Sequence, residues 1–225
     1  MNTKHFFSSI AKRYDFANTL LSLGFHHLWN RKLLLSLKGA TLLDFCAGTG
    51  AISKLALKRG FTKVVLVDFC EKMLGVAKQT LKKNAEFICA NVENIPLNQT
   101  FDHITMAYGI RNVQHPQKCF NEAFRLLKPG GSIALLELTK PKNPLLRFFH
   151  WIYLHTYLPL IGNLITKNKE AYSYLSSSIL AFDLDRIKVA LTHTGFSEIS
   201  IKSQTFGLAT IIIAKKSLSH LQNTP

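Results

Sequence analysis

The sequence predicts an α/β fold with a seven-stranded, mostly parallel sheet, helices on both faces and a C-terminal antiparallel hairpin. Two observations predict it. Short apolar runs alternate with amphipathic helical patterns along most of the chain, as in sheets whose parallel strands are joined by crossover helices. The last two apolar runs are separated only by the short turn at residues 205–207, which is typical of two antiparallel neighbours.

The individual elements follow from the same patterns. Strands are expected at residues 41–46, 63–68, 86–90, 101–107, 132–138, 197–203 and 208–214, and helices at residues 52–58, 72–83, 116–127 and 184–194. Two segments lie outside this alternation. Residues 1–38 predict an N-terminal helical cover, and residues 139–180 predict a helical lid inserted between the fifth and sixth strands. We therefore expect one domain over residues 1–225, since this length suits a single core.

The composition bounds the class of protein. An apolar fraction of 47% is enough for a packed core, and the net charge of +15 fits nucleic acid, an anionic membrane surface or simple solubility. The basic residues are spread over predicted helix faces, which favours solvated faces. The four cysteines share no C-x-x-C spacing, so no metal site is expected. With few cysteines and no predicted signal peptide, we expect a cytoplasmic protein.

Residues 148–166 lack Asp, Glu, Lys and Arg, which raises the question of a membrane span. The segment contains His150, His155, Pro159, Gly162 and Asn163, and such residues make a poor spanning helix. We expect instead a buried or substrate-facing helix that is broken near Pro159.

A glycine turn after the first predicted strand carries the main functional signal. That strand ends in Gly48-Thr49-Gly50, and Asp68 closes the next strand about 20 residues later. Glycines let the backbone approach a nucleoside, and an acid at this spacing accepts hydrogen bonds from the ribose diol. Ser53 stands where a dinucleotide fingerprint has its third glycine. The turn therefore resembles the S-adenosylmethionine pocket of the Rossmann-like class I methyltransferases.

In such open sheets the ligand lies beyond the carboxyl ends of the strands. The side chains expected near it are those at the predicted strand ends, namely Asp44, Asp68, Asn91, Ala107 and Glu137. Asp44 is expected to organise the glycine turn, with a cofactor contact as the alternative. Asp102 begins a strand and is expected to be structural.

Motifs along most of the chain then indicate a family. They are Lys12-Arg13-Tyr14-Asp15, Leu21-Ser22-Leu23-Gly24, the segment from Leu43 to Gly50, the segment from Asp68 to Leu74, Tyr108-Gly109-Ile110-Arg111-Asn112-Val113, the segment from Leu126 to Gly131, the segment from Leu158 to Gly162, and the segment from Tyr172 to Ile179. Together they resemble the demethylmenaquinone/ubiquinone C-methyltransferases, from about Lys12 to Ala214. The resemblance implies S-adenosyl-L-methionine as cofactor and a polyprenylated quinol as substrate, with demethylmenaquinol as the expected acceptor and the ubiquinone precursor still open.

The same resemblance implies cofactor contacts. Gly48, Thr49, Gly50 and Asp68 fall on the family's glycine turn and ribose-binding acid. Asn91 and Val92 match the pair that binds adenine after the third strand. Ala107 stands where the family usually has serine, and Ala51 replaces the usual acid after the turn. These two departures predict weaker cofactor binding or a shifted activity.

Catalytic candidates follow from the chemistry of methyl transfer to carbon, which needs an electron-rich ring and no metal. Arg111, just past the fourth strand, is expected to bind a ring oxygen and lower its pKa. It remains protonated, so it is not the base. Asn112 is expected to fix the ring or orient a water. Candidates for the base are Tyr14, Asp15, His26, His27, His150 and His155, the histidines because of their ordinary pKa, whereas Glu137 is expected mainly to form an ion pair.

The predicted lid is rich in aromatic and aliphatic residues, including Phe148, Phe149, Trp151 and Tyr157. This fits a packed lid helix, or else a channel for a polyprenyl tail with basic residues close to an anionic bilayer. The second interpretation predicts peripheral association at the inner face of the cell membrane.

Other function classes fit the sequence less well. The net charge fits an RNA or DNA methyltransferase, but the fourth strand leads into Tyr-Gly-Ile-Arg-Asn and not into an Asn/Asp-Pro-Pro-aromatic clamp. Another small-molecule methyltransferase, or a cofactor-binding module that has lost its activity, stays an alternative because of Ala51 and Ala107. A nicotinamide dehydrogenase ranks last, since the third glycine is absent.

Overall fold

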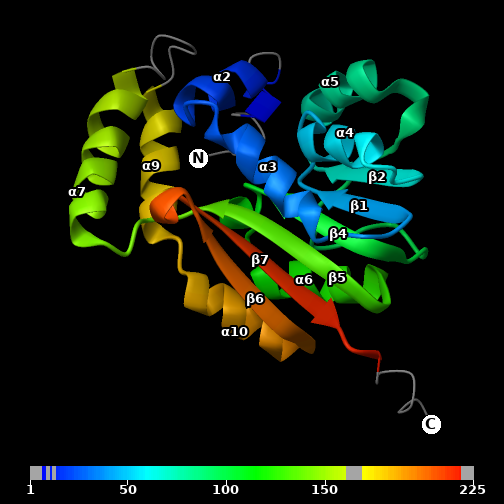
Figure 1. Cartoon of the computed structure of the whole chain (residues 1–225). Helices are drawn as coiled ribbons and strands as arrows, with labels where there is room; N and C mark the ends of the chain where they lie inside the picture. Colours follow the sequence, from blue (N-terminus) through cyan, green and yellow to red (C-terminus); the bar gives the residue numbers. More distant parts are fainter. Residues whose placement is uncertain (1–6, 9–10, 12–13, 161–168, 219–225) are drawn as a thin grey trace.

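The computed structural model describes residues 7–8, 11, 14–160 and 169–218, with the backbone alone for residues 169–173. A seven-stranded sheet in the order β3-β2-β1-β4-β5-β7-β6 forms its centre (Figure 1). Strands β1 to β5 run parallel, while β7 pairs antiparallel with both β5 and β6. The predicted sheet with a C-terminal antiparallel hairpin is confirmed. The strands are β1 (Thr41–Phe45), β2 (Lys63–Asp68), β3 (Glu86–Cys89), β4 (Phe101–Ala107), β5 (Leu127–Leu138), β6 (Phe196–Gln204) and β7 (Ala209–Lys216).

Helices cover both faces of the sheet, and each face has its own core. On one face lie α3 (Phe25–Leu35), α4 (Ala51–Lys58) and α5 (Glu71–Leu81), whose apolar residues pack with Leu42, Leu66 and Leu136 of the strands. On the other face α6 (Pro116–Leu126) and α10 (Leu184–Thr194) pack against Phe45, Ile104 and Leu135. The strand residues alternate between the two cores because successive side chains point to opposite faces.

Most predicted boundaries agree with the structure to within two residues. The main exception is β5, predicted to begin at residue 132, which begins at Leu127 and includes the Lys128-Pro129-Gly130-Gly131 segment, where Gly130 has a φ angle of 76°. A register shift between Phe101 and His103 of β4 accommodates this longer strand. Strand β4 pairs with Leu127 and next with Ser132, so residues 128–131 bulge out between these two positions, as their turn-like composition favours.

The predicted break near Pro159 is wrong in its position. Helix α7 (Pro144–Ile152) continues into a π-helical segment, η4 (Tyr153–Tyr157), and residues 158–160 are again helical. Proline lacks the N–H that would bond one turn back. The π segment lies in the turn that precedes it and adjusts the hydrogen bonding there. The helix is therefore irregular before the proline and does not end at it.

The cover and the lid meet above the sheet. The cover contributes α2 (Tyr14–Leu21) and α3, and the lid contributes α7, η4 and α9 (Lys169–Ala181), which stand at one end of the molecule in Figure 1. Leu154, Leu158 and Ile179 of the lid are buried together, and Leu21 of the cover packs against them. The Tyr153 hydroxyl also donates a hydrogen bond to the Leu21 carbonyl. Within the described residues, no helix is long and apolar enough to cross a membrane.

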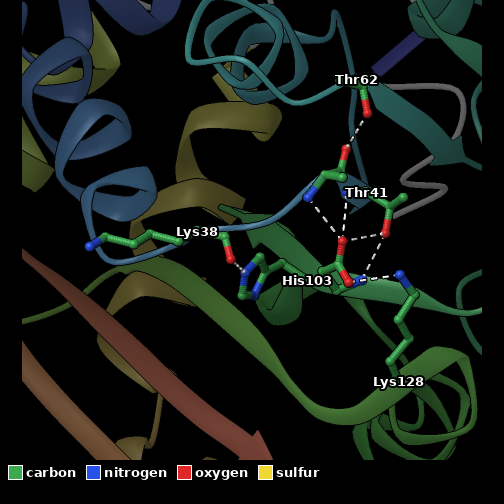
Figure 2. A network of polar contacts seen from close by, with 7 residues as sticks. Lys38, Thr41, Thr62, His103 and Lys128 are labelled. Atoms are coloured by element: carbon green, nitrogen blue, oxygen red, sulfur yellow. Dashed lines mark hydrogen bonds and ion pairs between the residues drawn. The ribbon is translucent and has the colours of Figure 1, made fainter.

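A polar network fastens the opposite edge of the sheet, where the parallel strands begin. The Asp102 carboxylate accepts hydrogen bonds from the backbone N–H groups of Ala40 and Thr41, from the Thr41 hydroxyl and from Lys128 Nζ, at 2.7–3.0 Å. Figure 2 shows Thr41 and Lys128 converging on this network, with Thr62 beside them. These contacts support the structural role expected for Asp102.

Candidate active site

The glycine turn lies where the order of the strands reverses. Strand β2 follows β1 on one side, whereas the chain returns on the other side with β4. Ligands of open α/β sheets bind in the crevice at such a switch point. Gly48 and Gly50 have φ angles of 56° and 79°, in the left-handed region that glycine adopts without strain. A Cβ atom at Gly48 would come within 3.2 Å of Met73 Cε, which is a tight contact. Glycine avoids this contact and leaves the backbone of the turn accessible.

Asp68 closes this crevice from the end of β2. Its Oδ2 atom accepts a hydrogen bond of 2.8 Å from the Gly48 N–H, and its Oδ1 atom accepts one of 2.8 Å from the Cys70 N–H. Burial raises the pKa of Asp68, while these two N–H groups oppose the shift. A carboxylate has about four acceptor positions. Two amide bonds therefore leave positions for a ribose diol, and Asp68 fits the predicted cofactor role.

Asp44 lies beneath the turn. It is 1% exposed and accepts hydrogen bonds from Ser53 Oγ at 2.7 Å and from Thr105 Oγ1 at 2.8 Å. Burial raises its pKa to about 6, against the lowering effect of these bonds. Asp44 thus ties the first turn of α4 to strand β4. This supports the expectation that it organises the glycine turn.

The structure brings Thr49 and Asp15 together, although the sequence gives them different roles. Thr49 Oγ1 donates a hydrogen bond of 2.6 Å to Asp15 Oδ1. Ser8 Oγ lies 3.3 Å from Cys70 Sγ, and Ala11 packs with Cys70 and Met73. The cover therefore rests directly on the glycine turn and on the start of α5.

The remaining predicted cofactor residues lie at the same edge of the sheet. Asn91, just past β3, is exposed, and its Oδ1 atom accepts the Glu93 N–H at 3.0 Å. Val92 is 5% exposed and belongs to the core beneath. Ala107 ends β4, half-buried against the other core. Contacts of these three residues with adenine or with the methionine part of the cofactor stay predictions.

A cavity of about 380 Å³ lies between the cover, the lid and the turn η5 (Thr205–Gly207). Its walls are mostly apolar, as is typical of small-molecule sites with a few polar groups that set orientation. The polar side chains on its wall include Tyr14, Asn18, Ser22, His26, Tyr108, Arg111, Asn112, His150, Tyr153, Tyr174 and Ser178. Asp15 is not among the described residues that line it. Of Tyr14 and Asp15, only Tyr14 therefore faces this space.

Arg111 is the buried cation of this cavity. Its side chain is 5% exposed, and its Nε atom lies 2.8 Å from Oε1 of the fully buried Glu137, without the alignment of a hydrogen bond. Its Nη1 atom is buried and has no hydrogen-bond partner among the described residues. Burial raises the pKa of Glu137, and the charge of Arg111 opposes this shift. The ion pair expected for Glu137 is present, and part of the guanidinium is left for a ligand.

Neighbouring polar groups hold this wall in place. Asn112 Oδ1 accepts a hydrogen bond of 3.0 Å from the Tyr174 hydroxyl of the lid, and the Tyr108 hydroxyl donates one of 3.0 Å to Asn30 Oδ1 of the cover. Sequence reasoning missed Tyr108, Asn30 and Tyr174 as individual site residues. Tyr108 has a φ angle of 59°, which is uncommon for a residue with a side chain. Tyr108 could have been identified as a site residue because it directly follows β4 in the Tyr-Gly-Ile-Arg-Asn motif.

The four histidines predicted as candidate bases fall into two groups, two on the cavity wall and two exposed to solvent. His26 and His150 line the cavity, and burial lowers the pKa of both, that of His26 to about 4. His27 and His155 are exposed, and His155 stacks on Trp151 with ring centroids 4.4 Å apart. Only the first two are placed to contact a ligand in this space.

Comparison with known proteins gives a consistent result. The model of the ubiE/COQ5 methyltransferase family matches residues 1–216. The chain is 41% identical to a demethylmenaquinone methyltransferase of Protochlamydia amoebophila, over 93% of each chain. It is 38% identical to a ubiquinone/menaquinone biosynthesis C-methyltransferase of Rickettsia typhi, over 93% of this chain and 90% of the other. A solved S-adenosylmethionine-dependent methyltransferase of Thermotoga maritima has the same fold, with a TM-score of 0.67 at 17% identity over 95% of this chain and 99% of that one.

Proposed function

The chain belongs to the ubiE/COQ5 methyltransferase family, and from this premise we propose how its site methylates an isoprenoid quinol. The enzyme is an S-adenosylmethionine-dependent C-methyltransferase of menaquinone and ubiquinone biosynthesis. When bound, the cofactor supplies a methyl group on a positively charged sulfur that leaves as a neutral thioether. The residues that would hold it are Gly48, Thr49, Gly50 and Asp68, with Asn91 and Val92 at the adenine.

The protein has two tasks. It must make a ring carbon electron-rich, and it must hold that carbon in line with the methyl group and the sulfur of the cofactor. We assign the first part to Arg111. A guanidinium aimed at a ring oxygen stabilises the phenolate and so lowers the pKa of the ring hydroxyl. Asn112 and Tyr14 on the same wall would fix the plane of the ring, and such positioning contributes several kcal/mol or more, on the order of 7–11 in favourable cases.

The observation that carries this proposal is the Nη1 atom of Arg111, for which the described residues provide no hydrogen-bond partner. A buried donor without a partner costs about 1–3 kcal/mol, and charged groups cost more. Here Arg111 is one of the residues that line a largely apolar cavity, and its Nε atom lies beside the Glu137 carboxylate. An apolar ring with an oxygen substituent would complete the coordination of Arg111.

A labelled-methyl assay tests the proposal. Demethylmenaquinol and the ubiquinol precursor are offered side by side with labelled S-adenosylmethionine, and the label is followed into the quinone product. Transfer to a quinol that depends on Arg111 supports the mechanism. Label in RNA, or binding of the cofactor without transfer to either quinol, would favour the rival functions.

We propose demethylmenaquinol as the preferred acceptor. The relative with the higher identity of the two compared, at 41%, is named for this reaction, whereas the relative at 38% is named for both pathways. The largely apolar wall also suits a fused naphthalene ring. A kcat/KM for demethylmenaquinol below that for the ubiquinol precursor would refute this preference.

We further propose that the enzyme works in the cytoplasm at the inner face of the cell membrane. The apolar residues of α7, here called the α7 face, are each 36–64% exposed, namely Leu145, Leu146, Phe148, Phe149, Trp151 and Ile152. Lys140, Lys142 and Arg147 are exposed beside them. An apolar helical face flanked by cations suits the surface of an anionic bilayer.

The mouth of the cavity supports the same orientation. Leu23, Phe25, Leu146, Phe149 and Phe206 line the cavity and are also 36–80% exposed, and they come from three separate segments. A polyprenyl tail that enters between them would remain in apolar surroundings on its way from the bilayer to the site. The cavity and the α7 face therefore share one side of the molecule.

Vesicle co-sedimentation tests this placement. The double variant Phe148→Glu/Trp151→Glu should lose binding to anionic vesicles while it keeps its turnover with a soluble short-tailed quinol, because neither residue lines the cavity. Val189→Glu, at an apolar position of α10 that is even more exposed, is the control and should bind like the wild type. Equal recovery of all three proteins with anionic vesicles would disprove contact through α7.

A further inference from the structure

His26 lies on the cavity wall at the start of α3 and is 8% exposed. Its Nδ1 atom is 2.7 Å from Ser22 Oγ. Its Nε2 atom has no hydrogen-bond partner among the residues that the structure describes. When one nitrogen of a buried imidazole is already hydrogen-bonded within the protein, the other nitrogen can form a hydrogen bond with a ligand.

The hydrogen bonds of Ser22 fix the tautomer of His26. The Ser22 hydroxyl has a single hydrogen, which it donates to the Asn18 carbonyl at 2.7 Å. Ser22 Oγ can therefore only accept from His26, so the proton of the neutral ring lies on Nδ1. The Nε2 atom carries the lone pair and is a pure acceptor.

The charge state of His26 agrees with this assignment. Burial lowers its pKa to about 4, the neighbouring His27 lowers it further, and Asp15 acts in the opposite direction. The His26 and His27 rings lie 3.8 Å apart, which disfavours a second positive charge. The imidazole is neutral at neutral pH, and Nε2 stays unprotonated.

We propose that His26 Nε2 accepts a hydrogen bond from a ring hydroxyl and thereby selects the reduced quinol over the oxidised quinone. This assignment rests on the proposed function and adds a specificity-determining residue to it. A quinone carbonyl has only lone pairs, so it cannot satisfy an acceptor. A quinol hydroxyl supplies the missing donor.

Arg111 cannot make this distinction. A guanidinium has donors only, so it can hydrogen-bond the carbonyl oxygen of a quinone as well as the oxygen of a quinol or its phenolate. Only the reduced form of the ring is nucleophilic enough to accept a methyl group. A second contact that requires an O–H group therefore keeps the unreactive quinone from occupying the site.

Anaerobic binding experiments with a matched pair of ligands test this role. The ligands are a naphthoquinone with one geranyl tail and its dithionite-reduced quinol, titrated in the presence of S-adenosylhomocysteine. The wild type should prefer the quinol by about tenfold or more, since a site that hydrogen-bonds a hydroxyl rejects an analogue that leaves the site group unpaired. His26→Gln should lose most of this preference, because an amide offers both a donor and an acceptor.

Two further variants separate the role from general damage to the site. His27→Gln changes the exposed neighbour and should keep the preference for the quinol. Ser22→Ala removes the acceptor that fixes Nδ1–H, so it should weaken the preference and change the nitrogen NMR shifts of His26. The wild-type shifts should report a proton on Nδ1.

The outcomes distinguish this inference from the proposed function. If the wild type methylates the quinol but binds both redox forms equally, or if His26→Gln keeps the wild-type preference, the role of His26 is wrong and the enzyme's function stands. If the wild type neither binds nor methylates either form, the proposed acceptor is wrong, and the role of His26 falls with it.

Discussion

The Thr49 hydroxyl donates a hydrogen bond of 2.6 Å to the Asp15 carboxylate, which joins the glycine turn to helix α2. Thr49 belongs to the predicted cofactor site, and Asp15 belongs to the cover. The contact shows that the cover is fixed by the same turn that would hold the cofactor. Cofactor affinity and the position of the cover are therefore expected to be linked.

Removing either partner of this bond should weaken both properties. Thr49→Val and Asp15→Ala should each lower the free energy of unfolding by about 0.5–1.5 kcal/mol, the usual net contribution of one hydrogen bond, since this bond is partly buried. Their effects should be non-additive in the double variant, because they share one interaction. Urea unfolding measures this coupling, and calorimetry with S-adenosylhomocysteine measures affinity. Thr19→Val, whose hydroxyl bonds only the exposed Asp15 carbonyl, is the control; fully additive losses would contradict the link.

Asp68→Ala should abolish measurable binding of S-adenosylhomocysteine. The variant lacks the acceptor for the ribose diol and also releases the Gly48 and Cys70 N–H groups. Asp68→Asn keeps the shape and one acceptor oxygen, so it should bind weakly. Calorimetric titration of both variants, with circular dichroism to confirm folding, provides the measurement. Unchanged affinity in a folded Asp68→Ala protein would remove this residue from the cofactor site.

Arg111→Ala should lower turnover by about tenfold or more while cofactor affinity stays close to that of the wild type. The variant also leaves Glu137 buried without its cation, which destabilises a fold. Arg111→Lys controls for this destabilisation. It keeps a positive charge beside Glu137 but loses the planar guanidinium with its several donors. It should remain folded and still be impaired. Turnover of the lysine variant equal to the wild type would show that the charge alone suffices.

Asp44 should make the protein less stable as pH rises from about 4 to about 7. Its folded-state pKa of about 6 lies above the ordinary value of 3.8, so the folded protein binds this proton more tightly than the unfolded chain. The stabilisation is complete below the unfolded pKa and is lost through the folded pKa, by about 3 kcal/mol. Urea unfolding of wild type and Asp44→Asn across this range should show their stability difference moving in favour of the variant as pH rises.

Asp102 should show the opposite pH dependence. Burial alone would raise its pKa, but hydrogen bonds from Lys128, Thr41 and Ala40 outweigh this and hold the pKa well below its ordinary value. Its contribution is therefore present above the unfolded pKa of about 4 and is lost as pH falls. The excess stability of the wild type over Asp102→Asn should be largest at pH 7 and should begin to shrink as pH falls below about 4. Since Asp102 lies at the far edge of the sheet, methyl transfer by the folded variant should be unchanged.

Most of the fold could be predicted because hydrophobic period and strand ends are local properties. The strands Lys63–Asp68 and Phe101–Ala107 and the helix Leu184–Thr194 agree with their predicted bounds. The extension of β5 back to Leu127 could not be predicted, because it depends on the pairing of Leu127 with Phe101 of β4 ahead of the Lys-Pro-Gly-Gly bulge. The π segment at Tyr153–Tyr157 was missed because it depends on how the lid packs on the cover.

The candidate site was predictable in its parts but not in its pairing. Asp68 and Arg111 were identified from their places after strands, and both lie at the expected edge of the sheet. The contacts Thr49–Asp15, Tyr174–Asn112 and Tyr108–Asn30 join residues that are 34, 62 and 78 positions apart. No local pattern encodes such contacts, because they arise only when the cover and the lid close over the sheet.

By itself, the sequence determined a doubly wound sheet with a bare glycine turn and an acid at the end of the second strand, because alternating apolar periods and turn residues act over a few neighbours. Only the tertiary structure decided which histidines line the cavity, which nitrogen of Arg111 lacks a hydrogen-bond partner among the described residues, and how Ser22 orients His26. Those properties depend on burial and on hydrogen-bond partners, and both are set by chain segments that meet only in the folded protein.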